Sequence, residues 1–289
     1  MKILVLGSKG QLGQCLNDQL AITEHDVVYT SRGQIDIAEF EVTKALMLEI
    51  SPDIVINATA YTAVDKAEEE RQSADRINHL AVANISKICN QLDCWLIHVS
   101  TDYVFDGNSE VPYKEDNPTN PQGVYGDSKL KGEAAIEASG CKYLIIRTAW
   151  VYSEYGNNFL KTMLRLGADR DELSIVGDQI GCPTYAQDIA KAIVMILESL
   201  KSKEVSSCLY HFSGNFCCSW AEFAHAIFDE ALELKVITSK PNVVTITTKE
   251  FPTLAKRPAQ SQLNSNKITI NFGIDSSDCM AGIRSSLAA

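Results

Sequence analysis

The sequence predicts an α/β fold built on a doubly wound parallel sheet, and three features of its first half carry this prediction. Short apolar runs rich in β-branched residues recur along that half. A stretch with apolar residues every three or four positions separates the third run from the fourth, and a glycine-rich loop directly follows the first. Nearly continuous apolar runs suit strands that are covered on both faces, and their alternation with helices favours parallel pairing.

The predicted strands lie in the first 150 residues, at Ile3–Leu6, Val27–Thr30, Asp53–Ala58, Trp95–Ser100 and Tyr143–Arg147. Between the third and the fourth, Ser73–Leu92 has the spacing of an amphipathic helix that faces a sheet. In doubly wound sheets, ligands bind in the crevice beyond the carboxyl ends of the strands. We therefore expect the functional site at that edge.

The pattern changes after about residue 150. Helices are predicted at Asn158–Leu166, at Gln187–Leu200 and from Ser219, where a capping box with Glu222 opens the helix, to about Leu234. Further strands are predicted at Leu173–Val176, Cys208–Ser213 and Val243–Thr248. We expect residues 1–150 to form a Rossmann-type nucleotide-binding domain and residues 151–289 a smaller α/β substrate-binding lobe, with the chain crossing between them and a cleft at their junction.

Charge and hydropathy restrict the class of partner. The 289 residues include 26 Lys plus Arg and 37 Asp plus Glu, which gives a formal net charge of −11. Such acidity provides no long-range attraction to nucleic acid or to an anionic membrane, so neither is an expected partner. No apolar stretch approaches the roughly 18–20 residues that span a bilayer, and the chain does not begin with a secretory signal. We expect a soluble cytoplasmic protein.

Nine cysteines are spread along the chain without C-x-x-C pairs or a metal-binding spacing with histidine. Several lie in apolar runs, as Cys94 and Cys141 do. We therefore expect small core residues in a reducing compartment, and neither a disulfide framework nor a zinc site.

The glycine-rich loop has the spacing Gly7-x-x-Gly10-x-x-Gly13 and opens a helix. Glycines there let backbone N–H groups and a helix N-terminus reach a pyrophosphate. Where an acidic residue after the second strand would bind a ribose 2′-hydroxyl, this chain has Ser31 and Arg32. Arg32, aided by Lys9, suits a 2′-phosphate, so we expect NADPH, with NADH accepted less well. The expected contacts of the loop are Gly7, Lys9, Gly10, Gln11, Leu12 and Gly13.

The candidate catalytic residues are Tyr125, Lys129 and Thr101. Tyr125 and Lys129 are four positions apart, which places them on one face of a helix, and Thr101 lies at the end of the fourth predicted strand. Reduction of a carbonyl needs a hydride on carbon and a proton on oxygen. Tyr125 can supply the proton if positive charge from Lys129 draws its pKa towards neutrality. Thr101 can donate a hydrogen bond to the carbonyl oxygen.

These motifs resemble those of the extended short-chain dehydrogenase/reductase family, which acts largely on nucleotide sugars. The resemblance extends beyond residue 260 and is carried by Asn57–Glu68, Ser100–Phe105, Asn120–Gly126, Arg147–Tyr152, Asn157–Phe159, Asp178–Thr184 and Lys256–Pro258. Within the family it points to a branch that reduces the C4 carbonyl of a dTDP-linked 4-keto-6-deoxysugar. It therefore implies a dTDP-sugar as substrate and a homodimer as the assembly.

The resemblance also implies a role for each matching residue. Tyr125 would protonate the C4 oxygen, with Lys129 as its electrostatic partner and Thr101 polarising the carbonyl. The cofactor would be contacted by Asp36 and Ile37 at the adenine, by Ala60, Tyr61 and Thr62 at ribose and phosphates, and by Val99 near the nicotinamide. The deoxysugar would be contacted by Thr101, Asp102 and Trp150, and the nucleotide by Arg257 and by the pair Asn157 and Asn158.

One departure from the family concerns metal. The resemblance includes family members that form dimers held by a magnesium ion. These members have glutamates shortly after the third glycine and after the Gly-x-Pro-Thr block. Here those positions are Cys15 and Gln187, neither of which is a good ligand for a hard cation. We therefore expect no catalytic metal and no magnesium bridge.

Other activities remain open on the same scaffold. Dehydratases of this family follow the active-site Thr with two acids, whereas this chain has Asp102 and then Tyr103. Epimerases retain NAD, which the missing acid after the second strand disfavours. A non-catalytic NADP-binding regulatory subunit would have no chemical need for Thr101, Tyr125 and Lys129 together.

Overall fold

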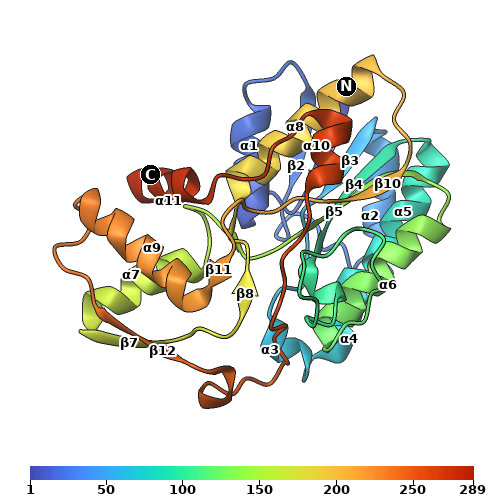
Figure 1. Ribbon diagram of the computed structural model, residues 1–289. Helices are drawn as coiled ribbons and strands as arrows, with labels where there is room; N and C mark the ends of the chain where they lie inside the picture. Colours follow the sequence, from blue (N-terminus) through green and yellow to red (C-terminus); the bar gives the residue numbers. More distant parts are fainter.

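A six-stranded parallel sheet forms the centre of the larger lobe in this computed structural model, which describes residues 1–289 (Figure 1). Its strand order is β10-β5-β4-β3-β1-β2, which confirms the predicted doubly wound topology. The five predicted strands are present as β1 (Lys2–Leu6), β2 (Asp26–Thr30), β3 (Ile54–Asn57), β4 (Trp95–Thr101) and β5 (Lys142–Thr148). The sixth, β10 (Cys208–His211), pairs with β5.

Helices cover both faces of the sheet. Ile3 and Val5 pack with α1 (Gln11–Leu20) and α8 (Ala186–Ser202). The alternate residues of the same strand, Leu4 and Leu6, pack with α2 (Phe40–Ile50), α5 (Ala81–Leu92) and α6 (Val124–Ala138). Because successive side chains of a strand point to opposite faces, the continuous apolar run of β1 fills two cores at once.

The predicted helix over 73–92 is present but interrupted. It consists of α4 (Arg71–Asp75), a π-helical turn η1 (Arg76–Leu80) and α5. The turn contains Asn78, whose buried amide contacts both Tyr61 backbone groups and the Ser128 hydroxyl of α6. Such π turns are rare and recur at functional sites, and nothing in the apolar spacing indicated this one.

The chain crosses between the lobes after residue 150. Helix α8 packs against α1, and β10 together with α10 (Asn266–Phe272) adds to the larger lobe. Residues beyond 150 therefore contribute to both lobes. The main elements of the smaller lobe are α7 (Phe159–Asp169), β7 (Glu172–Val176), α9 (Trp220–Glu233), β12 (Asn242–Ile246) and α11 (Cys279–Ala288), seen on the left of Figure 1.

Short elements complete the chain. They are α3 (Val64–Ala67), η2 (Asp102–Val104), β6 (Val151–Tyr152), β8 (Ile180–Gly181), β9 (Thr184–Tyr185), β11 (Cys218–Ser219) and η3 (Thr248–Glu250). The capping box at Ser219 is confirmed, since its hydroxyl accepts from the Glu222 N–H and the Glu222 carboxylate accepts from the Ser219 N–H. None of the helices combines the length and apolar character that crossing a bilayer requires.

The expectation that no cysteine forms a disulfide is wrong for one pair. Cys182 and Cys217 are bonded, while the other seven cysteines are free thiols and six of these are buried. The antiparallel pairing of β8 with β11 sets Gly181 opposite Cys218, which brings the two neighbouring cysteines together. A separation of 35 residues gives no sign of this contact in the sequence.

Candidate active site

Two connected cavities lie at the carboxyl ends of the sheet strands. The larger, of about 610 Å³, is lined by the ends of β3 and β4, by the start of α6 and by residues 148–157. The smaller, of about 210 Å³, is lined by the glycine loop, the end of β2 and residues 35–37. Lys9, Gly10, Ala58, Thr59 and Ala60 border both. An elongated ligand can therefore extend from one into the other.

The glycine loop is held tightly against the sheet. Gly7 has a φ of +89°, and its N–H donates to the carbonyl of Thr30 at 2.9 Å. A Cβ on Gly13 would come within 2.1 Å of the Gly7 carbonyl oxygen, so only glycine permits this turn. Gly10 is the N-cap residue of α1, and no side chain accepts a hydrogen bond from the first N–H groups of the helix. The first N–H groups of α1 thus remain available to an anion in the cavity.

The smaller cavity combines an apolar wall with an exposed cation. Ile35, Ile37 and Ile77 form the wall. The Arg32 side chain is 83% exposed at the rim, and its Nε lies 3.8 Å from the Asp36 carboxylate. An apolar slot suits a flat aromatic ring, and an exposed guanidinium at its mouth suits a phosphate.

Helix α6 carries Tyr125 in its first turn and Lys129 one turn later, and both line the larger cavity. Glu68 fixes the start of the helix by accepting from the Val124 N–H at 2.8 Å. Gly126 allows α6 to approach the end of β4, since a Cβ there would lie 2.1 Å from the Tyr103 carbonyl oxygen. The predicted helical placement of the Tyr–Lys pair is thus present.

Thr101 and Asp102 form the end of β4 and the start of η2. The Thr101 hydroxyl donates to Asp102 Oδ1 at 2.9 Å and accepts from the Tyr103 N–H at 3.2 Å. The Asp102 side chain is buried, and its second oxygen has no hydrogen-bond partner within the protein. Burial raises the pKa of Asp102 to about 6, which the hydrogen bond from Thr101 partly offsets.

The electrostatics of Tyr125 differ from the expectation. Burial raises the pKa of Tyr125, and Thr101 partly counteracts the effect. Lys129 does not lower it, because its side-chain nitrogen donates to the Val99 carbonyl at 2.7 Å and lies 3.1 Å from His98 Nε2. Burial lowers the pKa of Lys129 itself to about 8, against an opposite influence of Glu133. Tyr125 is therefore firmly protonated, and Lys129 titrates at about pH 8.

Trp150 is held in an unusual conformation at the junction of the lobes. Its φ is +49°, a value that is strained for a bulky residue. Its ring stacks on Trp220 of α9 with centroids 3.4 Å apart, and Gly181 lies against the ring so closely that a Cβ would come within 2.3 Å. The two lobes thus fix a flat aromatic wall of the larger cavity.

Most of the predicted contact residues line one of the two cavities, but five do not. Gly13 lies beneath the loop, and the Ser31 hydroxyl donates to Gln34. The Tyr61 hydroxyl donates to Glu70 at 2.8 Å. Asn158 donates to Gln11 Oε1 at 2.9 Å, while Arg257 donates to the Tyr103 hydroxyl at 2.9 Å and pairs with Asp65. Asn158 and Arg257 thus support residues that do line the larger cavity.

Several lining residues were not anticipated. Ser100 and Thr148 present buried hydroxyls without protein partners in the larger cavity. Thr59 and Tyr103 line it as well, whereas Asn157, which also lines it, was expected as a nucleotide contact. The only signal for Ser100 and Thr148 was a polar residue at the end of an apolar strand, where a doubly wound sheet forms its site.

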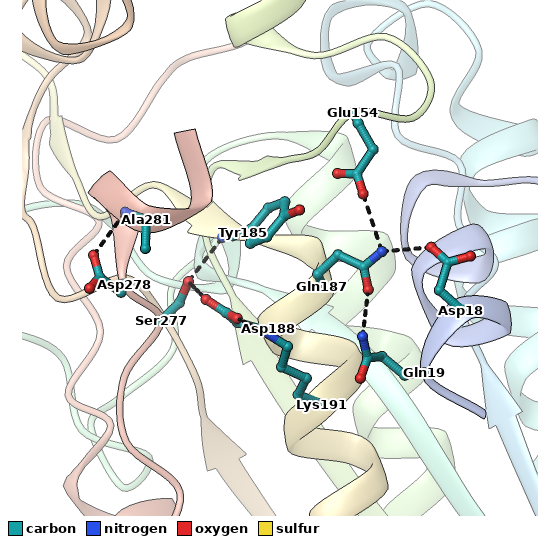
Figure 2. A network of polar contacts seen from close by, with 10 residues as sticks. All are labelled: Asp18, Gln19, Glu154, Tyr185, Gln187, Asp188, Lys191, Ser277, Asp278 and Ala281. Atoms are coloured by element: carbon teal, nitrogen blue, oxygen red, sulfur yellow. Dashed lines mark hydrogen bonds and ion pairs between the residues drawn. The ribbon is translucent and has the colours of Figure 1, made fainter. Parts of the chain in front are cut away.

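The position at which the family implies magnesium holds a hydrogen-bonded amide instead (Figure 2). Gln187 Nε2 donates to Asp18 Oδ2 at 2.6 Å and to Glu154 Oε1 at 3.2 Å, and Gln187 Oε1 accepts from Gln19 at 3.1 Å. Magnesium requires oxygen ligands, whereas here an NH₂ group points at both carboxylates. These residues therefore do not fit a magnesium ion, and no cluster of three or more His, Cys, Asp or Glu side chains suited to a metal occurs elsewhere.

Known proteins are similar to this chain over nearly its whole length. The family model described as RmlD substrate binding domain covers residues 1–289. A dTDP-4-dehydrorhamnose reductase of Aggregatibacter actinomycetemcomitans is 43% identical over 98% of this chain and 97% of its own. A crystal structure of a dTDP-4-dehydrorhamnose reductase from Clostridium acetobutylicum matches with a TM-score of 0.91 and 35% identity, covering 100% of this chain and 99% of that one. A crystal structure of the dTDP-4-dehydrorhamnose reductase from Bacillus anthracis in complex with NADP matches with a TM-score of 0.88 and 36% identity. The match covers 99% of this chain and 97% of that one.

Proposed function

The chain belongs to the dTDP-4-dehydrorhamnose reductase family, described by the RmlD substrate binding domain model, and from this membership we propose the reaction and the roles of its residues. The protein is an NADPH-dependent oxidoreductase of dTDP-rhamnose biosynthesis. It reduces the C4 carbonyl of dTDP-4-dehydro-6-deoxy-L-mannose to give dTDP-L-rhamnose. The observation that carries the proposal is the convergence of Thr101, Tyr125 and Lys129 in the cavity next to the glycine loop.

The residues around the two cavities fit NADPH. The N–H groups at the start of α1 and the close-packed glycines suit the diphosphate. Arg32 and Lys9 suit the 2′-phosphate, and the isoleucine wall beside Asp36 suits the adenine. Val99 and Lys129, which line the larger cavity, are assigned to the nicotinamide riboside. When bound, the cofactor supplies the hydride that reduces the sugar carbon.

Tyr125 supplies the proton. Its hydroxyl is protonated at physiological pH because burial raises its pKa. As hydride reaches C4, the carbonyl oxygen gains negative charge, takes the Tyr125 proton and becomes the C4 hydroxyl of the product. The Thr101 hydroxyl can donate to the same oxygen once it turns from Asp102, and the Lys129 ammonium stabilises the tyrosinate that remains.

The deoxysugar is assigned to the space between the lobes. Trp150 lines this space as an aromatic wall against which the sugar can pack, and the Asp102 carboxylate can accept a hydrogen bond from a sugar hydroxyl through its unpartnered oxygen. Asn158 and Arg257 are assigned to the nucleotide end. Their contacts with Gln11 and Tyr103 support an additional role in keeping the cavity wall in place.

Assembly and location extend this proposal. A homodimer follows from the family resemblance, and the amide of Gln187 leaves no place for a magnesium ion between Asp18 and Glu154. Seven free thiols among nine cysteines suit the reducing cytoplasm, where NADPH is available.

A spectrophotometric assay with product identification tests the reaction. Purified protein, NADPH and dTDP-4-dehydro-L-rhamnose should give one NADPH oxidised per sugar and dTDP-L-rhamnose as product. An epimerase or dehydratase would convert the sugar with no net oxidation of NADPH. A regulatory protein would bind NADPH without oxidising it, and either result would overturn the proposal.

A further inference from the structure

A chain of three buried polar side chains ends at Lys129. Asn57 at the end of β3 and His98 in β4 face each other in register, and both side chains are fully buried. His98 Nδ1 lies 3.1 Å from Asn57 Nδ2. On the other side of the ring, His98 Nε2 lies 3.1 Å from Lys129 Nζ. The proposed proton transfer involves Lys129 but neither Asn57 nor His98.

The orientation of the Asn57 amide is determined by its other contacts. Its Oδ1 accepts from the Thr59 backbone N–H at 3.1 Å and from the Thr59 hydroxyl at 2.5 Å. A backbone N–H can only donate, so the oxygen of the amide must face Thr59 and the NH₂ group must face His98. His98 Nδ1 therefore accepts a hydrogen bond. A neutral ring that accepts at Nδ1 carries its proton on Nε2.

The protonated Nε2 of His98 faces the nitrogen of Lys129. An ammonium group has no lone pair and cannot accept this hydrogen bond, whereas a neutral amine can. The amine also satisfies the second contact, because it can donate to the Val99 carbonyl at 2.7 Å. A charged Lys129 in the same place would set two donors against each other.

We propose that His98 is a positioning residue that binds Lys129 as a neutral amine, with its tautomer fixed by Asn57. Protonation of Lys129 breaks the contact with His98 and releases the ammonium towards Tyr125 and the cavity. The charge of Lys129 and its position are thereby coupled. The catalytic consequence of this coupling rests on the proposed reductase function, but the tautomer of His98 does not.

The ionisation of the surrounding groups supports this arrangement. Burial and the neighbouring Lys129 lower the pKa of His98 well below its usual value, so the ring stays neutral. Burial lowers the pKa of Lys129 to about 8. The titratable groups that face Lys129 are His98 on β4, and Tyr125 and Glu133 on α6. Glu133 favours the ammonium form, but its carboxylate is already paired with Arg147 of β5 at 2.6 Å.

Nitrogen NMR of the histidine ring tests the tautomer without reference to activity. The full-length protein is labelled with ¹⁵N at histidine, and the His98 signals are identified by their loss in His98→Gln. We expect an unprotonated Nδ1 and a protonated Nε2 from about pH 6 to about pH 9, with Nε2 shifting as Lys129 titrates near its lowered pKa. A proton on Nδ1, or a charged ring, overturns the proposal whatever the activity of the variants.

Asn57→Asp tests the coupling to catalysis. Its carboxylate can still accept from Thr59, but it can only accept a hydrogen bond from His98, so the ring must carry its proton on Nδ1 and Nε2 is free to accept from the Lys129 ammonium. The basic limb of the pH–rate profile should then move upwards by about one pH unit, the shift that one hydrogen bond to a charged group produces. An unchanged profile with a switched tautomer contradicts the coupling.

The double variant Asn57→Asp/His98→Gln separates this coupling from simple attraction between charges. If the shift acts through the ring, it disappears in the His98→Gln background. If it persists there, the introduced carboxylate acts on Lys129 by charge alone and His98 has no positioning role. A protein that shows the expected tautomer but never reduces the sugar would reject the proposed function and leave the assignment of the tautomer intact.

Discussion

Gly126 lies directly against the backbone carbonyl of Tyr103, where a Cβ would come within 2.1 Å of the oxygen. This contact seats α6 on the end of β4 and so brings Tyr125 and Thr101 into one cavity. Gly126→Ala must displace either the helix or the carbonyl, and we expect a loss of about 1–3 kcal/mol in stability and a fall of at least about tenfold in kcat. Gly33→Ala is the control, because nothing lies within 4 Å of that position. Equal effects of the two substitutions, measured by urea unfolding and by steady-state kinetics, would show that the close approach has no special role.

Arg32 is expected to select the cofactor. Its exposed guanidinium lies at the mouth of the smaller cavity, where it can pair with a 2′-phosphate that NADH lacks. Arg32→Ala should raise the KM for NADPH by about tenfold, which corresponds to one charge-assisted hydrogen bond, and leave the KM for NADH nearly unchanged. Steady-state kinetics with each cofactor provide the comparison. Parallel changes for both cofactors would remove Arg32 from the phosphate site.

Gln187 is expected to make the network in Figure 2 independent of metal. Its amide NH₂ group bridges the carboxylates of Asp18 and Glu154. A chelator should therefore change neither the melting temperature nor the assembly of the wild type. Gln187→Glu places a third carboxylate between these two, so it should lose about 1–3 kcal/mol of stability and regain part of it with magnesium. Thermal melts with and without the cation check both statements, and a wild type that melts earlier with chelator would contradict the first.

The buried carboxylate of Asp102 is expected to lower the stability of the folded protein at neutral pH. Its pKa is about 6 in the folded protein, above its ordinary value, so the folded state holds a proton that the unfolded state has released. Stability attributable to this group therefore falls as pH rises from about 4 to about 6. Asp102→Asn should be more stable than the wild type at pH 8 by about 1–3 kcal/mol, and the difference should vanish below about pH 4. Urea unfolding at several pH values measures this difference. A variant that is less stable than the wild type at pH 8 would show that the groups around Asp102 stabilise its charged carboxylate.

Much of the fold could be predicted because its strands are buried on both faces. The run Ile3–Leu6 supplies two different cores with alternate side chains, and this requirement leaves a continuous apolar signal in the sequence. The capping box at Ser219 is equally local and was equally visible. Features that depend on contacts between distant residues left no such signal. The bond between Cys182 and Cys217 follows from the pairing of β8 with β11, and β10 joins the larger sheet by pairing with β5, which is distant in sequence.

In the candidate site too, local patterns could be predicted and contacts between distant residues could not. Glycine spacing and the Tyr–Lys interval are local patterns, and they located the loop and the start of α6. The charge state of Lys129 could not be inferred from its neighbours in sequence, because His98 and Asn57 come from two other strands. Arg257 was placed at the nucleotide from a motif alone, whereas the folded chain pairs it with Asp65 and Tyr103.

The rate of Tyr125→Phe tests the central claim most directly. The substitution removes one hydroxyl, the proposed proton donor, and leaves the ring and its edge-to-face contact with Tyr103. Stopped-flow measurement of NADPH oxidation with dTDP-4-dehydro-L-rhamnose should show a rate about 10²–10⁴-fold below that of the wild type, with the Kd for NADPH nearly unchanged. Tyr143→Phe, on a distant part of β5, should behave as the wild type. Oxidation of NADPH by Tyr125→Phe at the wild-type rate would contradict the account.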